Sequence, residues 1–136
     1  MTKQEINDLT FDVLGAAIEV HKQIGSGLLE SVYQTCLKRE LEIRNIHFTS
    51  ETKVPVSYKG INMETELRCD FYIENIIVVE LKAVSEIVPV HEAQLLTYMK
   101  LLKAPKGILI NFHSSNIFKE GQKTFVNEFF RNLPQF

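Results

Sequence analysis

The first third of the chain carries apolar side chains at helical spacing. Thr2 and Glu5 form a capping-box pair, which predicts a helix beginning near Lys3. Its apolar positions recur every three or four residues until the glycine-rich segment 25–27 ends the pattern. A second helix with one apolar stripe is expected over residues 28–44. The N-terminal third therefore predicts two consecutive amphipathic helices.

The apolar pattern then changes to the short runs and alternation that are typical of strands. Strands are expected over residues 53–58, 66–73 and 76–84, with a tight turn at residues 74–75 between the last two. Pro55 places the first of these strands near an edge of the sheet. Short turns between successive strands predict an antiparallel meander.

Helix and strand signals alternate in the remainder of the chain. A helix is expected over residues 90–103 and a short hydrophobic strand over residues 107–112, an order typical of a parallel crossover. The tail from residue 117 to residue 136 predicts a final packed helix through its apolar side chains: Phe125, Val126, Phe129 and Phe130. The order α-α-β-β-β-α-β-α predicts an α/β fold, a mixed α+β sheet flanked by helices, in a single domain over residues 1–136.

Composition narrows the class of protein. With 45% hydrophobic residues in 136, the chain can bury a core. A net charge of -2 is weak evidence against a large general nucleic-acid-binding surface, although residues 85–136 carry six basic and four acidic side chains. No apolar run is long enough to cross a membrane, and the polar N-terminus does not look like a signal peptide, so we expect a cytoplasmic protein.

Charged side chains stand near the end of the third expected strand, whose earlier residues are apolar. Glu80 and Lys82 lie two positions apart near its end, so their side chains point to the same face. The turn at residues 74–75 places Asp70 of the preceding strand opposite Val79 or Glu80. Burying either charge without a partner is costly. A divalent cation between the two carboxylates would offset their repulsion, because Mg²⁺ prefers oxygen ligands.

This spacing leaves two interpretations open. In the first, Asp70 and Glu80 hold a metal ion while Lys82 holds an attacking water or a phosphate oxygen, as phosphodiester hydrolysis requires. In the second, the same residues form a cross-strand salt bridge on an exposed sheet face.

The helix after the strand carries a second polar group. Gln94 and Tyr98 are four residues apart and share a face, and His91 lies three residues before Gln94. Gln94 could orient a water or a nucleotide phosphate, and His91 could act as a general base or contact a phosphate of the substrate. An ordinary polar stripe with a packed tyrosine and a capping histidine explains the same pattern. Similarly, Glu30 in the first turn of the second helix is well explained by the helix dipole alone.

Together these motifs resemble the GxxExxY family of the PD-(D/E)XK nuclease superfamily. The resemblance covers residues 6 to 126. It rests on four groups of residues: Gly27-x-x-Glu30-x-x-Tyr33, Asp70, Glu80-Leu81-Lys82-Ala83-Val84, and the segment Pro89 to Tyr98 with its Gln94-x-x-x-Tyr98 spacing. It implies a restriction-endonuclease-like αβββαβ core with an extra N-terminal helix.

The resemblance also implies roles for individual residues. Asp70 and Glu80 would bind Mg²⁺, or Mn²⁺ in its place, and the Leu81 carbonyl would complete the metal shell. Lys82 would position or polarise the hydrolytic water, and Glu30 would assist the metal through water. Gln94 and Tyr98 resemble the Q-x-x-x-Y motif of RecB-like members. One departure from the superfamily pattern is Cys69, which stands where a proline often precedes the motif aspartate.

The resemblance favours a Mg²⁺-dependent nuclease that hydrolyses phosphodiester bonds in nucleic acid, DNA more than RNA. Specificity would then come from a homodimer, a partner protein or recognition of DNA shape. The alternative is a non-catalytic module that binds nucleic acid or protein on a nuclease-like fold. Hydrolysis of a small nucleotide or another phosphate ester is a third interpretation.

Overall fold

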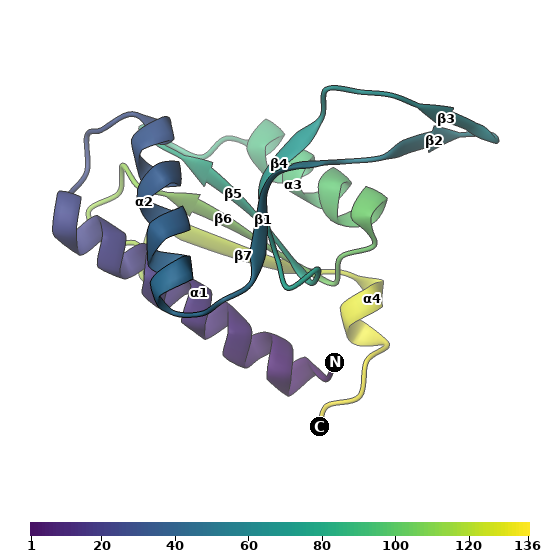
Figure 1. The fold of residues 1–136 in the computed structure, drawn as a ribbon, viewed down its shortest axis with the longest axis horizontal. Helices are drawn as coiled ribbons and strands as arrows, with labels where there is room; N and C mark the ends of the chain where they lie inside the picture. The colour runs from purple at the N-terminus through teal and green to yellow at the C-terminus, as the bar shows by residue number, and fades with distance from the viewer.

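The computed structural model describes residues 1–136 and has three layers, with helices on both faces of a mixed sheet (Figure 1). Helices α1 (Lys3–Ile24) and α2 (Glu30–Ile43) cover one face, and α3 (Pro89–Leu102) covers the other. The sheet has the order β1-β4-β5-β6-β7. Its strands are β1 (Phe48–Lys53), β4 (Arg68–Ile73), β5 (Ile77–Lys82), β6 (Lys106–Asn111) and β7 (Gln122–Val126).

The pairing of the strands matches the predicted mixed sheet. β1, β4 and β5 form an antiparallel meander, whereas β5 and β6 run parallel and are joined through α3. The core order α2-β1-β4-β5-α3-β6 is the αβββαβ order of a restriction-endonuclease-like fold, preceded by α1. The predicted fold class is therefore confirmed.

The N-terminal capping box forms as the sequence predicts. The Glu5 N–H donates to Thr2 Oγ1 at 3.1 Å, and the Thr2 N–H donates to Glu5 Oε1 at 3.1 Å. Gly25, at φ 74°, ends α1 in a conformation that favours glycine. The second helix begins at Glu30, two residues later than the pattern predicts.

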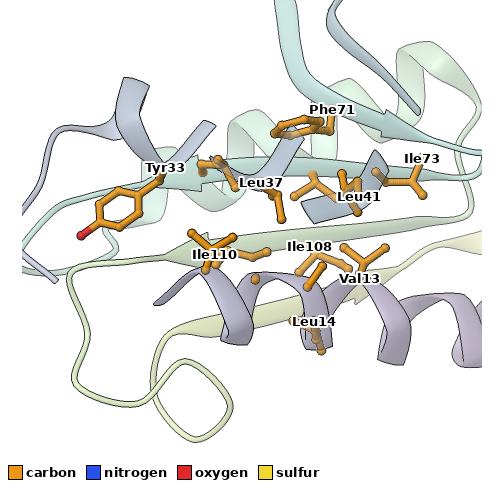
Figure 2. Packing of buried hydrophobic residues seen from close by; sticks show 14 of the residues in the cluster. Val13, Leu14, Tyr33, Leu37, Leu41, Phe71, Ile73, Ile108 and Ile110 are labelled. Carbon is orange, nitrogen blue, oxygen red and sulfur yellow. The ribbon is translucent and has the colours of Figure 1, made fainter. Parts of the chain in front are cut away.

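The larger core lies between the sheet and the first two helices. Alternate residues of β4, β5 and β6 point into it. Figure 2 shows those of β4 and β6 meeting side chains of α1 and α2. It is a cluster of 17 buried residues that includes Val13, Leu37, Phe71, Val79 and Ile108. Because these positions are fully buried, truncating one of the large side chains to alanine is expected to cost about 2–5 kcal/mol.

The smaller core lies under α3. Val78 and Leu109 point to this face and pack with Leu95 and Met99. A Cβ on Gly107 would lie 2.5 Å from the Met99 sulfur, so glycine at this position lets α3 approach β6 closely. Since Val78 points toward α3, strand alternation directs Glu80 and Lys82 toward α3 as well.

The prediction of a single packed helix in the C-terminal tail is wrong. Phe125 and Val126 lie in β7, which pairs antiparallel with β6, and only the one-turn helix α4 (Glu128–Arg131) follows. Without β7, the buried strand β6 would present an unpaired hydrophobic edge. The tail therefore forms a strand because the neighbouring strand needs a partner, which is a non-local requirement.

The predicted strand over residues 53–58 is also wrong in its bounds, because it is divided at Pro55. The segment before it is the end of β1, and the segment after it is β2 (Val56–Tyr58), which leaves the main sheet. β2 pairs only with β3 (Ile61–Met63). Proline has no N–H to continue a ladder, so the chain can diverge from β4 there. We call the β2–β3 hairpin, residues 56–63, the arm.

Candidate metal-binding and active site

A buried carboxylate, Glu80, and a half-buried one, Asp70, lie where the pairing of β4 and β5 ends. The last paired residues are Phe71 and Val79. Beyond them, side chains replace the ladder: the Asp70 N–H donates to Glu80 Oε2 at 2.7 Å, and the Leu81 N–H donates to Asp70 Oδ2 at 2.7 Å. Each carboxylate keeps a second oxygen outside these two bonds.

The electrostatics of this pair favour protons or a cation. Burial, followed by the charge of Asp70, raises the pKa of Glu80 to about 8. Burial first, with smaller effects of the charges of Glu30 and Glu51, raises the pKa of Asp70 to about 6, against hydrogen bonding from the Leu81 N–H. Lys82 lowers both pKa values but does not cancel the effect of burial. The site is therefore short of positive charge.

Lys82 brings an ammonium group to these carboxylates without pairing to either. Its side chain is half-buried, and none of the ion pairs within 4.0 Å includes it. Glu80 is only 5% exposed. These facts exclude the alternative of a cross-strand salt bridge on an exposed face. They leave Lys82 as a cation available to another group.

Helix α3 places one hydrogen-bonded pair beside the carboxylates. The Gln94 amide donates to Tyr98 Oη at 3.1 Å. Tyr98 is buried, and its pKa is raised by burial first and by the charge of Glu80 second, so its hydroxyl lies near that carboxylate. Gln94 is exposed and reaches the site through Tyr98.

His91 has a structural role at the start of α3. Its Nδ1 accepts the Val88 N–H at 3.2 Å, which satisfies one of the free donors at the N-terminus of the helix. This contact matches the alternative of a capping histidine. Contact between His91 and a substrate stays a prediction.

The loop before α2 is fixed by Tyr33, which positions Glu30. The Tyr33 hydroxyl donates to the Gly25 carbonyl at 2.7 Å and accepts the Leu28 N–H at 3.2 Å. Its ring stacks on Phe112 with 4.4 Å between centroids. Glu30, the first residue of α2, is exposed, and its charge raises the pKa of Asp70. The loop thus holds Glu30 close enough to Asp70 for the two charges to interact.

Glu51 of β1 is a neighbour of the site that the sequence pattern did not indicate. It lies level with Asp70, between the pairs Ser50–Phe71 and Thr52–Cys69. Its backbone is left-handed, with φ 50°, and its Oε1 accepts the Gln34 amide at 2.7 Å. Its charge raises the pKa of Asp70. The only available signal was the register of β1 against β4, because left-handed residues other than glycine are not read from sequence.

Comparison with models of protein families assigns the chain to a superfamily. A family model described as PD-(D/E)XK nuclease superfamily matches residues 7–125. The chain belongs to this superfamily. The searches of curated proteins and of solved structures each gave no match.

PD-(D/E)XK nucleases generally depend on a divalent metal ion, and the donors in this chain fit one. Asp70 and Glu80 supply oxygen ligands. Because the Leu81 N–H points toward β4, its carbonyl does too. No three His, Cys, Asp or Glu side chains come together as a ready metal cage. Mg²⁺ suits such a site, since it usually takes one or two carboxylates and completes its shell with water and phosphate.

Membership of the PD-(D/E)XK superfamily supports a nuclease-like function and suggests nucleic acid as the ligand. None of the helices has the length and apolar character needed to cross a membrane.

Proposed function

We propose that the chain is a Mg²⁺-dependent nuclease of the GxxExxY family, acting on phosphodiester bonds through one domain over residues 1–136. The observation that carries the proposal is the hydrogen-bonded pair of the buried Glu80 and the half-buried Asp70, with an unpaired Lys82 beside it. Such a pair is costly to ionise alone, and a divalent cation offsets that cost. Mn²⁺ would satisfy the same oxygen donors.

The proposed roles follow from the positions of the side chains. Asp70, Glu80 and the Leu81 carbonyl hold the cation, which would activate water and stabilise charge on the scissile phosphate. Lys82 holds the attacking water or a phosphate oxygen, because its ammonium group has no acidic partner of its own. Glu30, at the exposed start of α2, acts through water rather than by direct contact with the metal.

Gln94 and Tyr98 complete the proposed site from α3. Their mutual hydrogen bond restricts the rotation of the glutamine, which can then present its carbonyl oxygen to a water or its remaining N–H to a phosphate. We propose DNA rather than RNA as the substrate; a site that activates an external water does not need the 2′-hydroxyl of RNA, so it can act on DNA. Selection of a target site is assigned to a second copy or a partner protein.

The test is cleavage of end-labelled DNA and RNA, each single- and double-stranded, with Mg²⁺ and with EDTA. Glu80→Ala and Lys82→Ala should each reduce cleavage by about 10² or more. Lys100→Ala, on the exposed side of α3, is the matched control and should cleave like the wild type. If all substrates stay intact with either Mg²⁺ or Mn²⁺, or if the Lys82 variant retains full activity, catalysis at this site is refuted.

The second candidate is a non-catalytic module that binds nucleic acid or protein. The net charge of -2 favours it, because it leaves only weak general attraction for phosphates. Isothermal titration with Mg²⁺ separates the two functions. A nuclease should bind the ion and lose that binding in Asp70→Ala, whereas a non-catalytic module has no need of the ion.

A further inference from the structure

The arm projects from the body of the molecule, away from all of the helices (Figure 1). Its two strands pair only with each other through a two-residue turn, in which Lys59 and Gly60 both have positive φ angles. Two isolated strands are at best marginally stable in water. A projecting arm of this kind therefore suggests a ligand that packs against it.

The arm has one apolar face and one polar face. Val56 is opposite Met63 and Tyr58 is opposite Ile61, so these four side chains lie on the same face. They are poorly covered, with Tyr58 62%, Ile61 65% and Met63 46% exposed. Ser57 and Asn62 form the opposite face. A sheet face that is apolar, aromatic and open to solvent is typical of a binding surface.

Cations flank the apolar face. At the base of the arm, Lys53 and Arg68 are directly opposite each other, and both are exposed. Like charges in such a pair destabilise a sheet. The one acidic group within 4.0 Å is that of Glu66, which is 3.9 Å from Arg68 and almost fully exposed. At the tip, the Lys59 ammonium lies 5.4 Å from the Tyr58 ring centroid. The arrangement suits a ligand with anionic groups and flat apolar surfaces.

We propose that the arm binds unpaired nucleotides next to the scissile phosphate, with bases on the apolar face and a phosphate between Lys53 and Arg68. The placement of that phosphate rests on the proposed function, because Arg68 is only two residues before Asp70. Tyr58 is five positions along the chain from Lys53, so the tip lies at most ~17 Å farther out. The arm therefore reaches nucleotides beyond the one being cut.

Unpaired nucleotides fit this surface better than the other occupants. In a duplex the base faces are stacked inside, and the surface next to the arm would be phosphate and sugar, which offers nothing to Tyr58 and Ile61. Single strands expose base faces that stack on aromatic side chains while cations track the backbone. A second copy of the chain would gain only a few side chains from this face, far less than the ~800 Å² per partner of a stable interface.

The test is fluorescence anisotropy with labelled DNA of about 20 nucleotides, which spans one or more such sites. Ca²⁺ replaces Mg²⁺ to limit cleavage, and a blunt duplex of the same sequence is compared with the single strand. The double variant Tyr58→Ser/Ile61→Ser removes the apolar face. Ser57→Ala/Asn62→Ala, on the opposite face of the same hairpin, is the matched control. Melting temperatures and Mg²⁺ titrations of both variants check that the body of the protein is intact.

We expect the wild type to bind the single strand more tightly than the duplex. The apolar-face variant should bind the single strand about tenfold or more weakly, and the control within about twofold of the wild type. Equal losses in the two variants, or equal affinity for duplex and single strand, would overturn the proposal. The proposal would also be overturned if the wild type is a dimer, the apolar-face variant alone is a monomer, and nucleic-acid binding is unchanged. The occupant of the apolar face would then be a second copy of the chain.

The same experiment separates this inference from the proposed function. Arm-dependent binding of single strands without any Mg²⁺-dependent cleavage supports the arm and refutes only the nuclease. Cleavage by the wild type with equal affinities for both variants refutes only the arm.

Discussion

Replacing Glu80 by glutamine should stabilise the metal-free protein at alkaline pH. The amide oxygen can still accept the Asp70 N–H, so the change removes the ionisable group while keeping its hydrogen bond. In the native state burial raises the pKa of this carboxyl from 4.5 to about 8. The unfolded chain has no such burial and ionises freely.

The sign follows from proton linkage. A carboxyl whose pKa is raised on folding contributes its full stability below the unfolded pKa of 4.5, and this contribution is lost as the pH rises through about 8. The wild type should therefore become steadily less stable from pH 5 to pH 9. The glutamine variant lacks this ionisable group and should lose less stability, so the difference in free energy of unfolding between the two proteins should grow as the pH rises.

The magnitude can be worked from the same values. A rise in pKa from 4.5 to about 8, at about 1.4 kcal/mol for each pH unit, gives roughly 5 kcal/mol as an upper bound. Part of this belongs jointly to Asp70, whose charge is the second cause of the shift. We therefore expect a gain of about 2–4 kcal/mol at pH 9, or roughly 10 °C in melting temperature for a chain of this length.

The assay is thermal and urea unfolding in EDTA at pH 5, 7 and 9. Glu42→Gln removes the same charge from an exposed position on α2 and is the control. Added Mg²⁺ should raise the melting temperature of the wild type and have little effect on Glu80→Gln. If Glu80→Gln is less stable than the wild type at pH 9, the carboxylate is ionised and stabilised by the protein. The reasoning from burial would then be refuted.

Three further predictions concern neighbouring groups. Mg²⁺ binding should strengthen from pH 6 to pH 9 and release protons, because the pKa values of Asp70 and Glu80 are raised. Calorimetry in buffers of different ionisation enthalpy measures the affinity and the number of protons released, and an affinity that does not change with pH would contradict the prediction. Tyr33→Phe should cost about 1–3 kcal/mol in urea unfolding, because the Gly25 carbonyl and Leu28 N–H lose their partner; an unchanged midpoint would show that the loop needs no clamp. His91→Ala should lower the free energy of unfolding by about 1 kcal/mol and leave any cleavage unchanged; a selective loss of cleavage would instead make His91 a substrate contact.

The acidic pair was predictable because its register depends on a short local connection. A two-residue turn at residues 74–75 predicts Asp70 opposite Val79 or Glu80. The structure uses a three-residue loop, which pairs Ile73 with Ile77 and brings Asp70 level with Glu80. A shift of one residue changes which face a side chain occupies, so sequence reasoning found the pair but could not decide between the two registers.

The missed features depend on contacts between distant parts of the chain. β7 forms because β6 has a free edge, although the two strands are separated in sequence by the segment from residue 112 to residue 121. Glu51 adopts a left-handed conformation that costs about 1–2 kcal/mol in a residue other than glycine, and no local pattern announces it. The arm was missed because residues 53–58 look like one strand in the sequence, whereas in the structure Pro55 divides them between two sheets.

The proposed metal site and the arm share a physical origin in the loss of strand pairing around β4. Toward β5, the ladder ends at Phe71, and carboxylates take over as partners for the Asp70 and Leu81 N–H groups. Toward β1, the pairing ends at Lys53 and Arg68, where the chain leaves β1 for the arm and returns from it into β4. A continuous ladder would satisfy these backbone groups internally and leave no space for a phosphate. The open end of β4 therefore accounts both for acidic side chains directed at backbone donors and for cations whose one acidic neighbour within 4.0 Å is the exposed Glu66. A polyanionic substrate with a bound cation would need these two features.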